Sequence, residues 1–341
     1  MMNPGHALAS TWMAHATNGR ATGDHVVRNA ARGLVLSTSS MLLWSVGMYP
    51  SRDNVWTNAT QRVPGMNPET TPVLQTVMAM LAGGPYGPAD LAGAMNKSLV
   101  MRSCRSDGVL LRADKPATLL DSTWARSFDD LQPRRVAAAF TELAGGLRWS
   151  YILAINLADP YAVSAEDLAG GSAANPKYVV CQFGTTCSSG PFVDLASTTT
   201  PLMVPARPQL DEMTPGWSFA VAAPILSSGW VLLGEVEKIV AVSGRRFRNV
   251  VATTSMPLQA TVLAAVGETV EVAVLPAGER TRPIVVRCET TSAAPPRAPS
   301  LPAGEDPDVL LTLRCPTPST CTCNAPADAS VETRTWGMGR T

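Results

Sequence analysis

Hydrophobic and polar positions follow two different periodicities along this chain, and the change falls near residue 148. In the first part, the mostly apolar run 41–49 (Met-Leu-Leu-Trp-Ser-Val-Gly-Met-Tyr) predicts a strand that is buried on both faces. A helix is predicted to begin at Thr71 and Pro72 and to end at residue 82, because apolar residues recur there at helical spacing. Strands and helices that alternate with polar loops are typical of a parallel α/β fold.

The second part of the chain consists of short apolar runs separated by turn residues, which predicts β-strands. One run, 268–275, alternates polar and apolar residues, as a strand with one wet face does. The runs are 149–158, 177–183, 217–226, 230–242, 259–266, 268–275, 283–288 and 308–315. We therefore expect an antiparallel β-sandwich domain over residues 131–326, followed by a disordered polar tail, 327–341.

Composition and charge narrow the classes of function. A chain of 341 residues with 45% hydrophobic content is globular and long enough for roughly two domains. Lys+Arg and Asp+Glu both number 27, so no net field favours a nucleic-acid partner, and none is expected. No stretch reaches the roughly 18–20 apolar residues of a membrane-spanning helix, so no membrane span is expected.

Seven cysteines favour disulfides over a metal centre. Cys321 and Cys323 stand too close for a usual zinc knuckle, and histidine occurs only at 6, 15 and 25, so we expect no metal and no cofactor. Disulfides formed in a secretory compartment, with one thiol left over, are the favoured interpretation. Two glycosylation sequons, at Asn58 and Asn96, are compatible with that route. A secretory, extracellular or lysosome-like location is favoured if the full-length protein has a signal peptide; otherwise the location stays open.

Three polar loops of the first part carry the candidate chemistry: 19–25 (G-R-A-T-G-D-H), 49–56 and 83–90. In parallel α/β folds, functional residues gather on loops after the carboxyl ends of strands. Aromatic residues such as Trp44 suit the apolar face of a sugar, and carboxylates suit its hydroxyl groups. Each feature also has an ordinary structural interpretation: a turn-forming Asp beside Gly, a surface Arg–Asp pair, and a core tryptophan.

The order of these segments resembles the second half of the barrel in clan D glycoside hydrolases, the melibiase-type α-galactosidases and raffinose synthases. Where the raffinose-synthase branch has R-A-S-D-D-F at the end of a barrel strand, this chain has R-A-T-G-D-H. Segments 40–56 and 82–90 resemble the next two strand-and-loop units, and 107–118 resembles the link to the β domain. The resemblance covers roughly residues 15–125 and, loosely, the β domain; it rests on four motifs in order, none strong by itself.

The resemblance implies a fold and a set of site residues. Residues 1–130 would be the C-terminal part of a (β/α)8 TIM-barrel catalytic domain, giving an α/β plus all-β protein. Asp24 would be the general acid/base of a retaining glycosidase, with Arg20 contacting a sugar hydroxyl or holding that carboxylate. His25 replaces an aromatic residue of the family loop and Gly23 replaces an acid, so the role of His25 stays open. The substrate-binding residues would be Asp53, Trp56, Tyr86 and Asp90.

One departure from the family pattern concerns the nucleophile. A retaining glycosidase needs a second carboxylate about 5–5.5 Å from the acid/base, and no Asp or Glu precedes Asp24 here. We therefore expect a fragment without the nucleophile strand, inactive by itself, whose missing partner is an upstream half-barrel. Two alternatives stay open: a non-catalytic carbohydrate-binding or structural protein derived from that fold, and an unrelated β module for sugar binding or adhesion.

Overall fold

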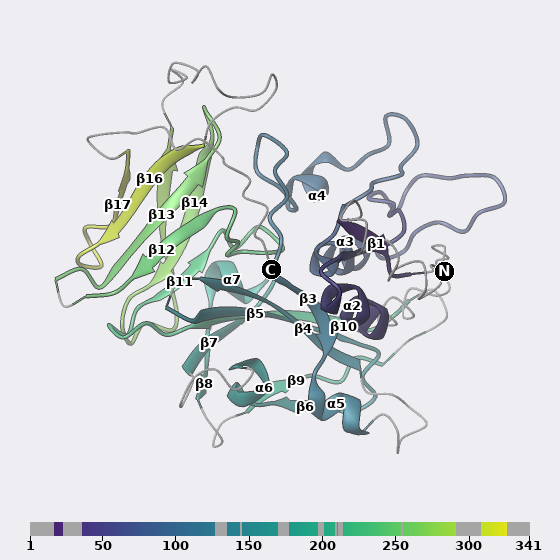
Figure 1. Ribbon diagram of the computed structural model, residues 1–341, viewed down its shortest axis with the longest axis horizontal. Coiled ribbons are helices and arrows are strands. Elements are labelled where there is room, and N and C mark those ends of the chain that lie inside the picture. Colours follow the sequence, from purple (N-terminus) through teal and green to yellow (C-terminus); the bar gives the residue numbers. More distant parts are fainter. Residues whose placement is uncertain are drawn as a thin grey trace.

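The structure is a computed structural model, shown in Figure 1. It describes residues 17–22, 36–126, 135–143, 145–169, 177–196, 201–208, 210, 214–253, 255–290 and 308–325. The helices are α2 (Leu36–Ser45), α3 (Pro72–Ala82), α4 (Lys97–Met101), α5 (Asp121–Arg126), α6 (Ala165–Ala169) and α7 (Thr186–Ser189). The first strands are β1 (Asn18–Arg20), β2 (Tyr49–Ser51), β3 (Lys115–Leu119), β4 (Arg135–Leu143), β5 (Leu147–Ile155), β6 (Tyr161–Val163), β7 (Lys177–Gln182), β8 (Val193–Ala196) and β9 (Leu202–Val204). The others are β10 (Trp217–Pro224), β11 (Val231–Gly234), β12 (Phe247–Val251), β13 (Leu258–Ala264), β14 (Thr269–Leu275), β15 (Ile284–Glu289), β16 (Val309–Cys315) and β17 (Thr322–Asn324).

The apolar run 41–49 is not the buried strand that its composition predicts. Most of it belongs to α2, and only its last residue, Tyr49, enters a strand, β2. Methionine and leucine are good helix formers, and periodicity cannot separate a short apolar run in a strand from one in a helix. The burial follows the helix: Leu43 is buried, whereas Met41 and Leu42 are 51% and 60% exposed.

The helix α3 has the bounds that the sequence predicts, but more of its surface is buried than the sequence predicts. α3 begins at Pro72 and is followed by Gly83, whose φ of +80° is the left-handed conformation in which glycine often ends a helix. The predicted helix is thus confirmed. All residues of α3 from Leu74 to Ala82 are buried, so the helix packs against neighbours on every side rather than along one apolar face.

Parallel pairing occurs at two places in the first part of the chain. β1 pairs with β2 in parallel register, Asn18 to Arg20 opposite Tyr49 to Ser51, and a parallel bridge joins Val55 to Pro88. Gly84 has no room for a side chain, because a Cβ there would lie 2.4 Å from the Pro50 carbonyl oxygen. Within the described ranges these strands do not close a barrel, and the predicted partial TIM barrel is not confirmed.

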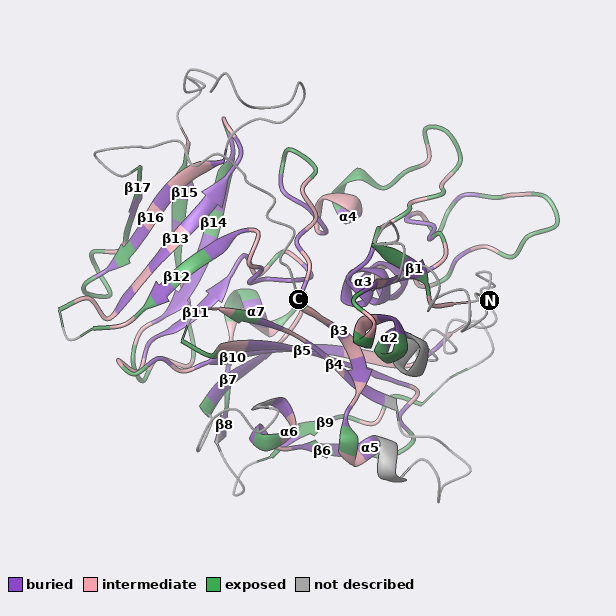
Figure 2. Cartoon of the chain, in the orientation of Figure 1, coloured by how far each residue is buried: buried purple, intermediate pink, exposed green. Residues whose placement is uncertain are grey.

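The main sheet has six antiparallel strands in the order β3-β4-β5-β10-β7-β8. Both of its faces are covered, and Figure 2 shows buried residues along β4 and β5. One face packs on α3 and the C-terminal strands, through residues such as Tyr151, and the other packs on β6, β9 and α6, through residues such as Ile152. This explains why β5 reads as a continuous apolar run rather than an alternating one.

The C-terminal strands form two further antiparallel sheets, β11-β14-β15 and β12-β13-β16-β17, which share one core. The prediction of a β-rich second part is therefore confirmed. The run 230–242 is wrong as a single strand: β11 ends at Gly234, whose φ is +81°, and the chain turns away there. The sequence pattern missed β4, which is rich in alanine, and the short strand β12. The domain division at residues 130 and 131 stays a prediction; β3, which precedes it, pairs with β4.

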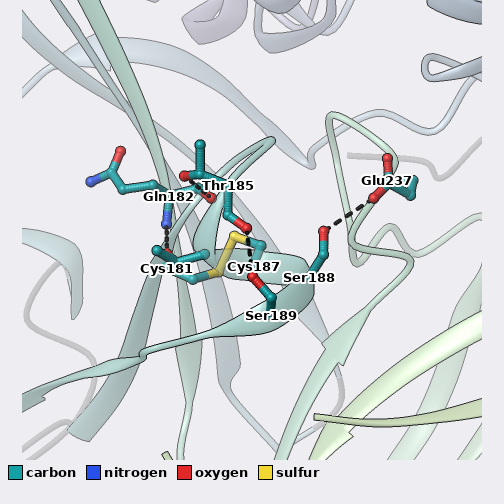
Figure 3. The surroundings of a disulfide bond; sticks show 8 residues. Cys181, Gln182, Thr185, Cys187, Ser188, Ser189 and Glu237 are labelled. Atoms are coloured by element: carbon teal, nitrogen blue, oxygen red, sulfur yellow. Dashed lines mark hydrogen bonds between the residues drawn. A yellow bond between two sulfur atoms is a disulfide. The ribbon is translucent and has the colours of Figure 1, made fainter. Parts of the chain in front are cut away.

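Three disulfides form among the described cysteines: Cys181–Cys187, Cys288–Cys323 and Cys315–Cys321. Cys104 is the thiol left over, and it is buried. Figure 3 shows the first bond beside α7, where the Ser188 hydroxyl donates to the Glu237 carboxylate at 3.1 Å. The predicted disulfides with one remaining thiol are thus confirmed.

A buried charge network joins the segment before the main sheet to the C-terminal sheets. Arg246 donates from Nε to Glu235 at 2.6 Å, and from Nη1 and Nη2 to Glu268 at 2.8 and 2.7 Å. Arg105 pairs with Asp107 and Asp308, at 2.7 Å to each. The Ser106 backbone N–H also donates to Glu268, at 3.0 Å. Charges removed from water are tolerated here because each arginine has carboxylate partners.

Candidate functional site

The carboxyl ends of β1 and β2 bring two predicted site residues together. The Arg20 guanidinium (Nη1) lies 2.9 Å from the Asp53 carboxylate (Oδ1), although 33 residues separate them in sequence. The Asp53 backbone N–H donates to the Thr22 hydroxyl at 3.0 Å, and that of Ala21 to the Ser51 carbonyl at 2.8 Å. Parallel pairing sets this geometry, because neighbouring parallel strands end at the same edge of a sheet. We call residues 20–22 and 51–53 the β1–β2 carboxyl edge.

Solvent reaches this edge unevenly. The Arg20 side chain is 41% exposed and the Asp53 side chain 19%. An ion pair at such a surface contributes little to stability, about 0–1 kcal/mol. A guanidinium beside a carboxylate nevertheless presents both donors and acceptors, which is the combination that recognises hydroxyl groups.

Arg52 lies between Ser51, the last residue of β2, and Asp53. The sequence did not single it out as a site residue. Its side chain is buried, and the Nε and Nη1 atoms have no hydrogen-bond partner among the residues that the structure describes. Burial lowers the pKa of Arg52 to about 10, although the charges of Glu69 and Asp53 act in the opposite direction. Buried polar atoms without partners are rare, and a lowered pKa beside a carboxylate is one mark of a candidate site. The only sequence signal was a cation placed directly beside Asp53 at the end of a strand.

Asp90 organises the neighbouring loops. Its carboxylate accepts hydrogen bonds from the Thr57 backbone N–H (2.8 Å), the Thr57 hydroxyl (2.7 Å), the Asn58 backbone N–H (3.1 Å) and the Gln61 amide (2.9 Å). These bonds hold the loop after residue 56 against the loop that contains Asp90. None of these contacts tests the predicted role of Asp90 in substrate binding, which stays a prediction.

The predicted aromatic residues lie mostly inside the protein. Trp56 is 9% exposed, which leaves little of its indole face for a ligand. Tyr86 is half-buried; burial raises the pKa of its hydroxyl, which lies 3.2 Å from the Thr76 hydroxyl. Trp44 is half-buried against Tyr49, with ring centroids 5.8 Å apart. Their packing supports the structural interpretation of these rings at least as well as a sugar platform.

Gly23, Asp24 and His25 lie outside the described residues, so the acid/base assignment stays a prediction. Within the described part of the chain, no group of three or more His, Cys, Asp or Glu side chains is placed to hold a metal ion. Over the same part, no helix has the length and hydropathy to cross a bilayer.

Comparisons with known proteins find weak likenesses. Neither the models of protein families nor the curated proteins contain a match to this chain. Among solved structures, an α-galactosidase from Saccharomyces cerevisiae with raffinose is similar at a TM-score of 0.35 and 10% identity, covering 61% of this chain and 58% of that one. A structure of α-galactosidase (MEL1) from the same yeast gives a TM-score of 0.37, 10% identity, and coverage of 61% and 59%. The chain thus spans less than two thirds of either protein, and at such TM-scores the likeness carries no argument about function.

Proposed function

We propose that this chain is a glycoside hydrolase-like protein that binds an α-linked, galactose-like sugar at the β1–β2 carboxyl edge. The observation that supports this most directly is the contact between Arg20 and Asp53. Arg20 is the last residue of β1 and Asp53 lies two residues after β2. Each lies in a segment whose sequence resembles a strand-and-loop unit of the α-galactosidase and raffinose-synthase families, and the two meet at 2.9 Å. In this proposal the first 130 residues are the last strands of a TIM barrel.

The edge supplies the chemistry that sugar hydroxyls require. Arg20 donates hydrogen bonds, and the Asp53 carboxylate accepts them, so one hydroxyl can bridge the pair. The buried charge of Arg52 also attracts the Asp53 carboxylate. Hydrogen bonds to charged groups contribute about 1.5–3 kcal/mol each, which suffices to select a sugar by the direction of its hydroxyls.

Catalysis with retention would need two further parts. Asp24, four residues beyond Arg20, is proposed to protonate the leaving glycosidic oxygen and then to deprotonate the incoming water or sugar hydroxyl. The nucleophilic carboxylate is proposed to come from a further segment of the barrel that this chain does not supply. The 341-residue chain is therefore expected to bind sugar and to show no turnover of aryl α-galactosides.

A groove in the C-terminal sheets favours a second candidate function. It has a volume of about 340 Å³ and lies between β15 and the segment around β17, with Arg287, Ser319, Thr322 and Asn324 among its lining residues. A non-catalytic protein that binds carbohydrate in this groove would account for the polar lining. The two candidates differ in where the sugar binds.

Replacing Asp53 with asparagine is expected to weaken binding of methyl α-galactoside about 10- to 100-fold, because one charged hydrogen bond is lost. Isothermal titration calorimetry measures the affinity. The matched control is Asp194→Asn, which removes a carboxylate from another surface Arg–Asp pair, with Arg280 at 2.5 Å, on β8. Equal affinities in the wild type and the Asp53 variant would reject the proposed site.

The variant Arg52→Met tests the role of Arg52 in sugar binding separately from its role in folding stability. Burial of the Arg52 charge costs free energy, and two of its three nitrogen donors have no partner among the described residues, so this variant is expected to be as stable as the wild type or more stable, by up to about 4 kcal/mol. Its affinity for the sugar is expected to fall about tenfold, as the loss of about 1.4 kcal/mol requires. The control is Arg105→Met, which removes a buried arginine that has carboxylate partners and is expected to destabilise the fold. Urea unfolding gives both stabilities, and a destabilised Arg52 variant would show a structural role for this residue.

A further inference from the structure

The two glycosylation sequons lie on neighbouring loops but in opposite environments. Asn96 is exposed and precedes α4, where its side-chain carbonyl oxygen accepts from the Leu99 backbone N–H at 3.2 Å. The same oxygen accepts from the hydroxyl of Ser98, the third residue of the sequon, at 2.8 Å. The Nδ2 atom of Asn96 donates no hydrogen bond within the described part of the chain, and it is the atom to which a glycan attaches.

Asn58 uses the corresponding atom to hold the fold. It is half-buried, and its Nδ2 donates to the Ala94 carbonyl at 2.8 Å. Its side-chain oxygen accepts from the backbone N–H and the hydroxyl of Thr60, both at 2.8 Å. A glycan on this nitrogen would have to fit between two loops that Asp90 already holds together.

The disulfides supply an independent observation on the compartment. Three such bonds form among the described cysteines, and structural disulfides persist in oxidising, secretory environments. N-linked glycans are added to sequons in secreted proteins. Disulfide formation and sequon glycosylation both take place in the secretory pathway, so the disulfides and the sequons point to the same route.

We propose that Asn96 carries an N-linked glycan and that Asn58 does not. The donor is an oligosaccharide linked through pyrophosphate to a lipid. The bond between the sugar C1 and the pyrophosphate oxygen breaks and a bond from C1 to Asn96 Nδ2 forms. The lipid pyrophosphate leaves with the bonding electron pair, and the amide nitrogen releases one proton to water. Because the helix cap uses only the carbonyl oxygen of Asn96, the cap survives the modification. The glycan would stand beside Met95, which is 51% exposed.

The test is to secrete the full chain from a eukaryotic cell behind a cleavable signal peptide and to measure its mass before and after peptide N-glycosidase. One glycan is expected, at Asn96. Ser98→Ala removes the acceptor sequence, keeps the asparagine that caps α4, and is expected to abolish the mass shift. Ser98→Thr keeps the sequence and the shift, and Thr60→Ala, which removes the other sequon, leaves the shift unchanged. A secreted protein without a glycan, a glycan at Asn58, or a shift that survives Ser98→Ala would each overturn the proposal. The sugar-binding edge plays no part in this test.

Discussion

Replacing Glu268 with glutamine is expected to lower the free energy of unfolding by about 3–5 kcal/mol, the range for breaking a buried ion pair. Glu268 accepts two hydrogen bonds from Arg246, at 2.8 and 2.7 Å, and one each from the backbone N–H groups of Ser106 and Ala265, at 3.0 and 2.8 Å. A glutamine keeps one oxygen but turns its NH₂ group toward a donor. Arg246 would then keep Glu235 as its charged partner, and part of its charge would be buried without compensation.

The matched control for this variant is Glu271→Gln. Glu271 also pairs with an arginine, Arg287, at 2.9 Å, but their side chains are 54% and 70% exposed. Removing an exposed pair costs about 0–1 kcal/mol, so urea unfolding of the two variants should differ by several kcal/mol. Equal and small losses would show that the buried network does not fix the C-terminal sheets to the segment around Ser106.

The pH dependence of this effect follows from the direction of the pKa shifts. Burial raises the pKa of Glu268, but the hydrogen bonds and charge of Arg246 outweigh burial and hold it at about 2, against an ordinary value of 4.5. The contribution of Glu268 to the free energy of unfolding is fully present above pH 4.5 and is lost as the pH falls toward 2. Burial raises the pKa of Glu235. The contribution of Glu235 to the free energy of unfolding is therefore greatest at low pH and is lost as the pH rises through that raised pKa. The stability difference between the wild type and Glu268→Gln should therefore shrink between pH 4.5 and 2.

Removal of the Cys288–Cys323 disulfide is expected to have an effect of similar size. This bond joins β15 of one C-terminal sheet to β17 of the other, and it closes a sequence separation of 35 residues. In the chain-entropy account of cross-links, a loop of this length corresponds to roughly 4 kcal/mol. The double variant Cys288→Ala and Cys323→Ala leaves no unpaired thiol at either position, and its thermal or urea unfolding measures the loss.

The Cys315–Cys321 disulfide, at the end of β16, provides the comparison. Cys315 and Cys321 are separated by only 6 residues, for which the same account gives roughly 2 kcal/mol. Removing both of these cysteines should thus cost about half as much as removing the longer link. A larger loss from the short link would show that the joining of the two sheets contributes less than local order in the turn after β16.

The sequence predicted the elements whose local signals agree with their packing. α3 has a proline at its start and a glycine at its end, and β14 alternates between exposed and buried residues from Thr269 to Val272, although its last three residues are also buried. The run 41–49 was misassigned because Met, Leu and Trp fit a buried strand and a partly exposed helix equally well, and only tertiary contacts decide. β4 escaped notice because its alanines give little hydrophobic contrast, while its place between β3 and β5 buries them.

The candidate site was predicted only in part, for a physical reason. The polar loops 19–25 and 49–56 were identified from the sequence, and the structure brings Arg20 of the first against Asp53 of the second. The predicted place of Arg20 beside Asp24 lies outside the described residues and stays a prediction. The contact between Arg20 and Asp53 depends on the parallel register of β1 and β2, which no local pattern encodes. Arg52 was overlooked because a charged loop residue is normally solvated, and its burial follows from packing alone.

The most direct test of the proposed function is an amide-resolved NMR titration of the 341-residue chain with methyl α-galactoside. The backbone signals of Ala21, Thr22 and Asp53 are expected to shift as the sugar is added, while those of Val285 and Thr322, in the groove of the C-terminal sheets, stay in place. Shifts confined to the groove would contradict sugar binding at the β1–β2 carboxyl edge and favour the non-catalytic alternative. The absence of any shift at saturating sugar would contradict both.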